Sequence, residues 1–189
     1  MTVDFAAART NMVESQVRTA DVTDLAIQEA MRAVPREAFA PPGKSWLAYA
    51  DAEIEYAPGR WMLRPRDVAK LLQALRPRAG ERALAMAAPY AGAVIAAMGL
   101  AVTAQEAAAT IPAGALYDLI VCEGAVAKAP AAWLAALAEG GRLGVVERDG
   151  PVGRAMLYLN AGSGVGSRPL FDSTPPVLAG FEAPRRFAL

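Results

Sequence analysis

Few side chains in this sequence could act as a nucleophile or a base. The 189 residues include a single cysteine, Cys122, and no histidine. Histidine is the usual base that activates a serine or cysteine nucleophile, so that pairing is absent. A disulfide framework or a metal site of cysteines and histidines is excluded for the same reason. Cys122 ends the apolar run Leu119–Cys122. We predict a small core residue there, because free cysteines are among the most buried residue types.

The other candidates are carboxylates and one glycine-rich segment. Residues 162–166 read Gly-Ser-Gly-Val-Gly, without the Lys-Ser/Thr pair of a phosphate-binding loop and without a helix after it. This segment is therefore predicted to be a hairpin turn. Their positions in the sequence do not indicate a partner for any of the carboxylates Glu53, Glu55, Glu123 and Glu147.

The composition argues against binding by a large surface charge. The 19 Lys and Arg residues balance the 19 Asp and Glu residues, so no basic surface is expected for nucleic acid or an anionic membrane. Hydrophobic residues make up 54% of the chain and charged residues 20%, which is typical of a globular domain. We divide this single domain, 1–189, into an N-terminal helical and loop cap, 1–66, and a core, 67–189.

One stretch could be taken for a membrane span. Ala83–Thr103 contains no charged residue and is long enough to cross a bilayer. It is interrupted by Pro89, Gly92 and Gly99, which favour a strand, a helix and a second strand instead. No signal peptide is recognised at the start of the sequence, so we expect a cytoplasmic protein.

The elements that must position these residues follow from periodicity. Helical spacing predicts a first helix over Asp4–Arg18 and a second helix that is capped by Asp21 or Thr23 and stopped by Pro35. A third helix is indicated by the apolar spacing of Val68, Leu71, Leu72 and Leu75.

Beyond residue 80, short apolar runs alternate with helices, the pattern of a parallel α/β sheet. The predicted strands are Arg82–Ala87, Ala101–Ala104, Tyr117–Cys122 and Arg142–Glu147, and the predicted helices are Gly92–Met98 and Pro130–Ala138, the latter ended by Gly140-Gly141. Arg154–Asn160 and Val165–Phe171 flank the glycine-rich turn and predict an antiparallel hairpin at the sheet edge.

Several segments carry motifs whose order and spacing are specific when taken together. They include the helix Met12–Arg18, the V-P-R-x-x-F segment Val34–Phe39, Tyr49–Asp51, Tyr117–Val121 and Gly140–Leu143. Together they resemble the protein-L-isoaspartate O-methyltransferase family nearly from end to end. Arg168–Asp172 is similar to a segment of bacterial members. The chain thus looks like a shortened and degenerate bacterial member of that family.

The resemblance implies a truncated Rossmann-like class I methyltransferase sheet with N-terminal helices and a C-terminal antiparallel hairpin. The implied reaction is methyl transfer from S-adenosylmethionine to the α-carboxylate of an isoaspartyl residue, which begins its repair to aspartate. That reaction needs no histidine, because a carboxylate is already ionised near neutral pH. The task of the enzyme is to place this carboxylate in line with the methyl group.

The cofactor loop departs from the family pattern. Where the family has an acidic residue followed by glycines, this chain has Ala85 and then Ala87, Ala88 and Pro89. Each change adds bulk where the cofactor would pass, and Pro89 also lacks an N–H donor. Tyr90 aligns with the family tyrosine and is one of the two residues that we assign to the degenerate cofactor site.

The wall of the adenine pocket is also shortened. Only residues 105–116 separate the second core strand from Tyr117, and one parallel crossover already takes a dozen or more residues. We infer that a helix and the third strand, which lies at the sheet edge, are deleted. Glu106 aligns with the ribose-binding carboxylate and is the other cofactor residue that we assign. Its alternative is a solvated residue that opens a helical turn over Glu106–Thr110.

The substrate side departs as well. Trp61–Pro65 aligns with the T-I-S-Q-P segment of the family, and Leu63 replaces the hydroxyl residue. Leucine neither donates nor accepts a hydrogen bond, so no catalytic residue is assigned. Arg64 could bind a carboxylate as a fork, or it could be an ordinary surface arginine.

These departures make a pseudoenzyme the main hypothesis. Such a protein would bind no cofactor and would act through a protein partner or self-association, with the sheet edge left by the missing strand as one surface. The alternative is an active carboxyl methyltransferase that binds S-adenosylmethionine through an atypical loop. An open pocket around Ala87–Tyr90 would favour an enzyme, and a filled one would exclude it.

Overall fold

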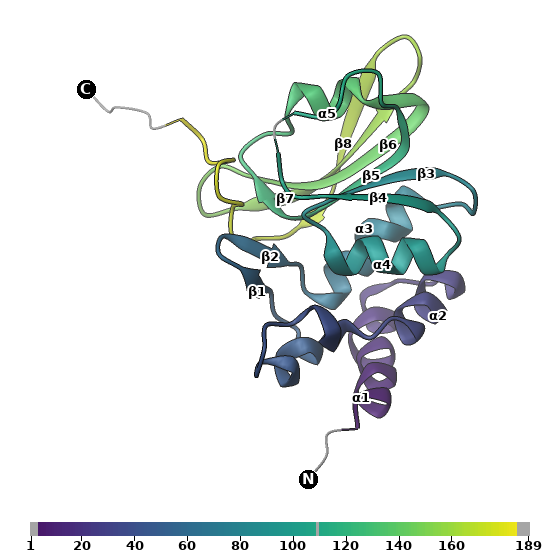
Figure 1. Cartoon of the computed structure of the whole chain (residues 1–189), viewed down its shortest axis with the longest axis vertical. Helices are drawn as coiled ribbons and strands as arrows, with labels where there is room; N and C mark the ends of the chain where they lie inside the picture. Colours follow the sequence, from purple (N-terminus) through teal and green to yellow (C-terminus); the bar gives the residue numbers. More distant parts are fainter. Residues whose placement is uncertain (1–3, 109, 185–189) are drawn as a thin grey trace.

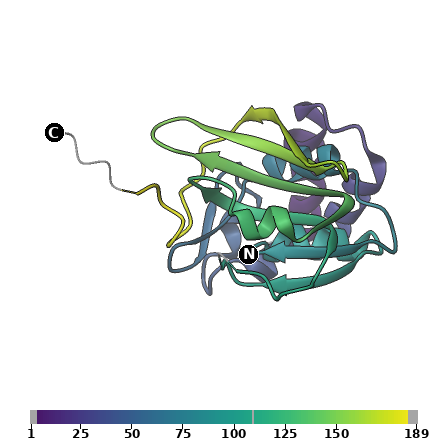
Figure 2. The same cartoon turned by 90° about the horizontal axis from the view of Figure 1, so that it is seen from above.

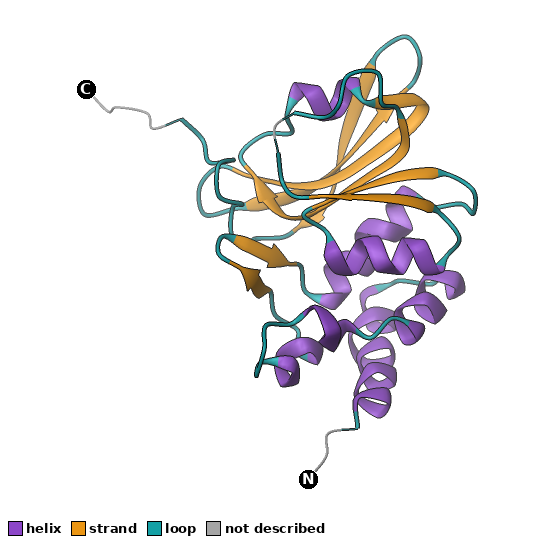
Figure 3. Cartoon of the chain, viewed as in Figure 1, coloured by secondary structure: helices purple, strands orange, loops and turns teal. Residues whose placement is uncertain are grey.

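A computed structural model describes residues 4–108 and 110–184 of the chain. A six-stranded sheet lies at its centre. Helices α3 (Pro65–Leu75) and α4 (Pro89–Ala97) cover one face, and the short helix α5 (Ala131–Ala135) covers the other (Figure 1). Seen from above, α5 lies in front of the sheet and the N-terminal helices lie behind it (Figure 2). Colouring by secondary structure shows these helices as a further layer beneath α3 and α4 (Figure 3).

The sheet is parallel in its first four strands and antiparallel in its last two. In spatial order its strands are β4 (Ala101–Gln105), β3 (Arg82–Met86), β5 (Tyr117–Val126), β6 (Leu137–Arg148), β7 (Gly153–Asn160) and β8 (Val165–Asp172). β4, β3, β5 and β6 pair in parallel, and β7 and β8 pair antiparallel. The predicted fold class is confirmed, including the C-terminal hairpin at an edge of the sheet.

β4 forms the other edge, as the inferred deletion requires. Between β4 and β5, the described residues 106–108 and 110–116 form neither helix nor strand. The helical turn considered for Glu106–Thr110 is therefore not formed by its described residues, and Ala109 lies outside them. A crossover this short leaves no room for a helix and a further strand.

Side chains on alternate positions of β3 enter different cores. Ala83 and Ala85 pack in the cluster that contains α3, α4 and the N-terminal helices. Leu84 and Met86 pack on the opposite face with Trp133, which is fully buried. This alternation is the two-residue period of a strand that is covered on both faces.

The N-terminal layer begins with a capped helix that changes its winding. Asp4 accepts a hydrogen bond from the N–H of Ala7 (3.0 Å) and caps α1 (Phe5–Met12), which continues as a π-helical segment, Val13–Val17, and a 3₁₀ turn, Arg18–Ala20. The predicted helix Asp4–Arg18 therefore exists, with only its first half wound as an α-helix.

The predicted cap of the second helix was wrong. Asp24 caps α2 (Leu25–Ala33), because its side chain accepts hydrogen bonds from the N–H groups of Ala26 (2.9 Å) and Ile27 (3.2 Å). Asp21 instead has a φ of +62° and reverses the chain before the helix begins. A short polar side chain tolerates that left-handed conformation better than most others.

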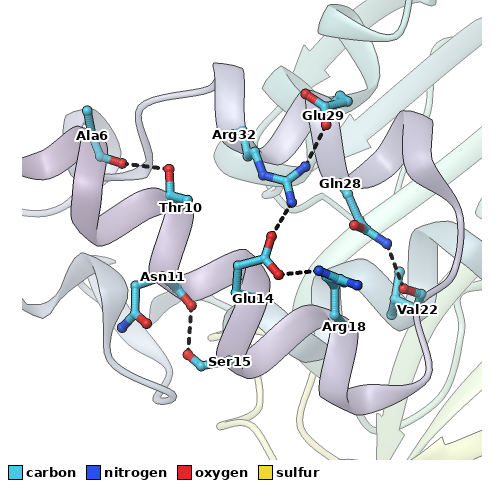
Figure 4. Close-up of polar contacts among 10 residues, drawn as sticks. All are labelled: Ala6, Thr10, Asn11, Glu14, Ser15, Arg18, Val22, Gln28, Glu29 and Arg32. Atoms are coloured by element: carbon cyan, nitrogen blue, oxygen red, sulfur yellow. Dashed lines mark hydrogen bonds and ion pairs between the residues drawn. The ribbon is translucent and has the colours of Figure 1, made fainter.

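A polar network joins the π-helical segment to α2 (Figure 4). Glu14 accepts hydrogen bonds from Arg18 and from Arg32 (2.6 Å), and Arg32 also donates to Glu29 (2.6 Å). All four side chains keep contact with solvent.

Two further predicted helices have different bounds in the structure. α4 begins at Pro89 rather than Gly92, and proline is favoured in the first turn of a helix. α5 ends at Ala135, and Gly140-Gly141 lies within β6 instead of ending the helix. Leu137 already pairs with Tyr117, so sheet pairing overrides the helical tendency of the alanines there. The uncharged stretch Ala83–Thr103 forms β3, α4 and most of β4, and every helix in the described part of the chain is too short or too polar to cross a bilayer.

A small hairpin connects the N-terminal layer to the sheet. It consists of β1 (Ile54–Ala57) and β2 (Arg60–Met62) and follows two 3₁₀ segments, Arg36–Phe39 and Ser45–Tyr49. The C-terminal segment passes beside this hairpin, where the N–H of Ala179 donates to the carbonyl of Gly59 (3.3 Å).

Candidate functional site

A cleft of about 430 Å³ lies beside the carboxyl ends of β3 and β4. In open parallel sheets, ligands bind at this end of the strands, and the volume suits a small molecule. The lining is mostly apolar and consists of Tyr56, Ala85, Ala87, Ala88, Pro89, Gly92, Ala93, Ala96, Val102, Ala104, Gln105 and Glu106. Ala87, Ala88 and Pro89 therefore line an open pocket. The sequence alone did not determine whether side chains would fill this space.

The loop that replaces the family's glycines keeps a glycine-like turn. Ala87 has a φ of +44°, in the left-handed region that favours glycine, and its N–H donates to the carbonyl of Gln105 (2.8 Å). A Cβ atom added to Gly92 would lie 2.7 Å from the Cβ of Ala85. The first turns of α4 therefore pack against β3 so closely that both positions must be small.

A buried carboxylate next to this loop caps α4. One oxygen of Glu123 accepts hydrogen bonds from the N–H groups of Tyr90 and Ala91 (both 3.1 Å), and the other accepts from the N–H of Leu63 (3.3 Å). Ala88, the residue at the N-cap position, has no side chain that could do so. Glu123 follows the apolar part of β5, so a carboxylate of the central sheet satisfies the free end of the helix.

Glu123 shares the interior with a buried arginine. Both residues have 0% exposure. Burial raises the pKa of Glu123 to about 7, and the positive charge of Arg36 opposes this shift. Arg36 donates to the carbonyls of Ala48 (2.9 Å) and Leu63 (2.6 Å). The two charges therefore tie the N-terminal layer to the first turn of α4.

Glu106, one of the two predicted cofactor residues, lies at the mouth of the cleft. Its side chain is 77% exposed, and one of its oxygens lies 3.5 Å from Nε of Arg60. Arg60 belongs to β2 and also donates to the carbonyl of Ala179 (3.2 Å). The ion pair therefore joins the β1–β2 hairpin to the end of β4.

Tyr90, the other predicted cofactor residue, does not line the cleft. Its fully buried ring points into the N-terminal layer, where its centroid lies 6.1 Å from that of Phe39 and 4.6 Å from Cζ of Arg36. A role for Tyr90 in binding a cofactor stays a prediction. Only its backbone N–H is engaged near the cleft loop, with Glu123.

The two substrate-side residues are occupied within the protein. Leu63 is 1% exposed and packs in the core. The guanidinium of Arg64 lies 3.1 Å from Glu53 and 3.2 Å from Asp67. Arg64 is therefore a half-buried arginine that already holds two carboxylates of its own chain.

Three residues of this region were not predicted from the sequence: Glu123, Tyr56 and Arg60. A signal existed for Glu123, because it directly follows the apolar run of a central parallel strand and so lies at the carboxyl edge of the sheet. Cys122 is fully buried as predicted, and burial raises the pKa of its thiol. Within residues 4–108 and 110–184, no group of three or more acidic, cysteine or histidine residues could hold a metal ion.

Comparison with known proteins shows the fold and the family. A protein-L-isoaspartate O-methyltransferase from Methylorubrum extorquens is 35% identical to the chain over 184 residues, covering 82% of this chain and 80% of that protein. The enzyme of the same name from Methylorubrum populi is 33% identical over 181 residues, covering 81% and 85%.

Solved structures agree on the architecture. A protein-L-isoaspartate O-methyltransferase from Plasmodium falciparum, in complex with S-adenosyl-L-homocysteine, superposes with a TM-score of 0.75 at 16% identity and covers 90% of this chain and 97% of that one. No family model matches the chain. The identity to the Methylorubrum proteins extends over most of both sequences, and the chain therefore belongs to the protein-L-isoaspartate O-methyltransferase family.

Proposed function

We propose that this chain is an S-adenosylmethionine-dependent methyltransferase that esterifies the α-carboxylate of isoaspartyl residues in proteins. The observation that carries the proposal is the open cleft at the carboxyl ends of β3 and β4, with Glu106 at its mouth. The two Methylorubrum relatives, whose names state this class of enzyme, support it. The proposal replaces the pseudoenzyme, which was the main hypothesis from the sequence.

The residues of the cleft fit a nucleoside cofactor. The carboxylate of Glu106 can accept hydrogen bonds from ribose hydroxyls, and the alanines with Pro89 offer an apolar surface to a purine ring. The Tyr56 hydroxyl is buried and has no hydrogen-bond partner in the described part of the chain. When bound, the cofactor supplies an electrophilic methyl group. We therefore propose S-adenosylmethionine as the cofactor, in place of the expectation that none is bound.

The chain's own part in the reaction is placement. A substrate carboxylate is ionised near neutral pH and needs no base, which agrees with a chain that has no histidine. Holding it in line with the methyl group converts an encounter in solution into a reaction within one complex. The apolar lining beside Pro89 offers few hydrogen-bonding groups to water near a bound cofactor.

Transfer of a labelled methyl group to a synthetic peptide tests the proposal. We expect transfer to a peptide with one isoaspartyl residue and none to the same sequence with aspartate. Glu106→Gln is expected to raise the cofactor KM about tenfold, because it removes a charged hydrogen-bond acceptor. The matched control is Glu29→Gln, an exposed carboxylate of α2. Absence of transfer at saturating cofactor would contradict the proposed activity.

A second candidate function is that of a family member without the reaction, acting through protein contacts. The observation that favours it is the substrate side: Leu63 is buried where the family has a hydroxyl, and Arg64 is held by Glu53 and Asp67. Neither side chain is free to meet a substrate carboxylate.

The two edges of the sheet support this candidate unequally. β8 carries Arg168, Pro169 and Asp172, and charges and proline discourage pairing with another chain. β4 has the sequence Ala-Val-Thr-Ala-Gln, with neither charge nor proline. Sedimentation across a range of concentrations would test self-association at β4, and calorimetry would test the cofactor. Micromolar binding of S-adenosylmethionine would remove this candidate.

We also propose that the protein is bacterial and works in the cytoplasm, where it would meet aged proteins. The two Methylorubrum relatives support a bacterial origin. Fractionation of cells that express the full chain tests the location, and recovery in the membrane pellet would contradict it.

A further inference from the structure

One hydroxyl at the cleft has no hydrogen-bond partner among the residues that the structure describes. Tyr56 belongs to β1 and lines the cleft, yet its hydroxyl oxygen is buried without a hydrogen bond to residues 4–108 or 110–184. Buried polar groups are nearly always hydrogen-bonded, and an exception calls for an explanation. A ligand that completes the bond would provide one.

The other polar side chains of the lining are already engaged. Gln105 donates to the carbonyl of Thr110 (3.1 Å), and Glu106 pairs with Arg60. Tyr49 and Tyr158 show what this protein does with phenols elsewhere: their hydroxyls donate to Glu37 and Glu147. The hydroxyl of Tyr90 also lacks a partner among the described residues, but its ring lies in the N-terminal layer, outside the lining.

The charges around the hydroxyl define the kind of ligand. Burial raises the pKa of Tyr56, the negative charges of Glu106 and Glu123 act in the same direction, and the positive charge of Arg60 opposes them. The phenol therefore keeps its proton and can donate it to an acceptor. The positive charge of Arg60 is paired with Glu106. An anionic ligand would meet the exposed carboxylate of Glu106 at the mouth of the cleft, so the site favours a neutral or positively charged one.

We propose that the Tyr56 hydroxyl donates a hydrogen bond to a neutral or cationic nucleoside in this cleft, while the carboxylate of Glu106 disfavours nucleoside phosphates. The proposal rests on the proposed function for the identity of the site. It assigns the recognition to a residue of the N-terminal hairpin, in addition to Glu106 of the sheet.

Calorimetric titration of the full chain tests the assignment, with S-adenosylhomocysteine, adenosine and AMP as probes. Tyr56→Phe is expected to weaken binding of S-adenosylhomocysteine about fivefold, the usual effect of one neutral hydrogen bond. Tyr158→Phe, whose hydroxyl bonds to Glu147 away from the cleft, is expected to bind like the wild type. AMP is expected to bind more weakly than adenosine.

Thermal unfolding without ligand supplies the second readout. Tyr56→Phe breaks no hydrogen bond within residues 4–108 and 110–184, so its Tm is expected to equal or exceed that of the wild type, whereas the Tm of Tyr158→Phe is expected to fall. Equal affinity of Tyr56→Phe and the wild type would overturn the assignment, as would tighter binding of AMP than of adenosine. Binding by the wild type without methyl transfer, with Tyr56→Phe weakened, supports the assignment and removes the proposed reaction. A wild type that binds none of the probes overturns both.

Discussion

Opposite charges meet at two depths in this molecule. In the N-terminal layer, Glu14, Arg18, Glu29 and Arg32 form a network whose side chains are 25% to 72% exposed (Figure 4). Beside the cleft, Arg36 and Glu123 are both fully buried. The exposed network joins two neighbouring helical segments, whereas the buried pair joins the N-terminal layer to α4.

The two networks are stabilised by different partners. The exposed charges bond mainly to one another, and such pairs are screened by water and salt. Glu123 receives its hydrogen bonds from the backbone of Leu63, Tyr90 and Ala91, and Arg36 donates to the backbone of Ala48 and Leu63. Buried charges need this surrounding backbone, because their mutual attraction alone rarely offsets the loss of hydration.

The largest effect is expected from Arg36→Met. This change leaves Glu123 buried without its positive counterpart and removes the hydrogen bonds that Arg36 donates to two backbone carbonyls. The free energy of unfolding is expected to fall by about 3–5 kcal/mol, as measured by urea denaturation. The double variant Arg36→Met/Glu123→Gln is expected to lose less than the sum of the single losses. Additive losses would show that the two charges are not coupled.

Glu123→Gln tests the buried charges through the pH dependence of the unfolding free energy. In the folded protein, burial raises the pKa of Glu123 from 4.5 to about 7, so the folded state binds this proton more tightly than the unfolded state. The resulting contribution to the free energy of unfolding is fully present below pH 4.5 and is lost as the pH rises through 7. Relative to Glu123→Gln, the wild type is expected to lose about 3 kcal/mol between these limits.

The groups around Glu123 leave that titration visible. Arg36 is the charged residue that faces it, and burial raises the pKa of Tyr90 and Cys122, so both keep their protons. Urea denaturation of both proteins at several pH values gives the difference directly. A difference that does not change with pH would contradict the buried, titrating state of Glu123.

An intermediate effect is expected from Arg142→Lys, at a half-buried site. Arg142 binds both oxygens of Glu81 (2.8 and 3.0 Å) and donates to three backbone carbonyls, of Leu75, Arg76 and Asp118. Lysine keeps the charge but cannot reproduce the fork, so a loss of about 1–2 kcal/mol in unfolding free energy is expected. Arg154→Lys, in the exposed pair with Asp172, is the matched control and should change little.

The smallest effect is expected from Glu14→Gln. Glu14 has solvent around it, and its two arginine partners can each bind water instead. The Tm is expected to change only slightly in dilute buffer and not at all near 1 M salt, where the screening length is about 3 Å. A large, salt-independent fall in Tm would show that this network stabilises the fold as strongly as Arg36 and Glu123 do.

Local signals in the sequence were enough for much of the fold. The alternation of short apolar runs predicted the parallel strands and the hairpin around Ala161–Gly164, and the isolated Cys122 was correctly placed in the core. Boundaries failed where a distant partner decided them. Leu137 pairs with Tyr117 in the sheet, so α5 ends at Ala135, although Ala136 and Ala138 favour a helix.

Only the tertiary structure decided the character of the site. The hydrogen bonds of Glu123 join residues 32 to 60 positions apart, and no periodicity, cap or turn signal acts over such distances. The cleft stays open because alanines, though bulkier than glycine, still fit the left-handed turn at Ala87 and the close contact of Ala85 with Gly92. Residue types, order and spacing determined the family pattern and which elements form. Packing determined which carboxylate is buried, which tyrosine faces the cleft and how much space remains between them.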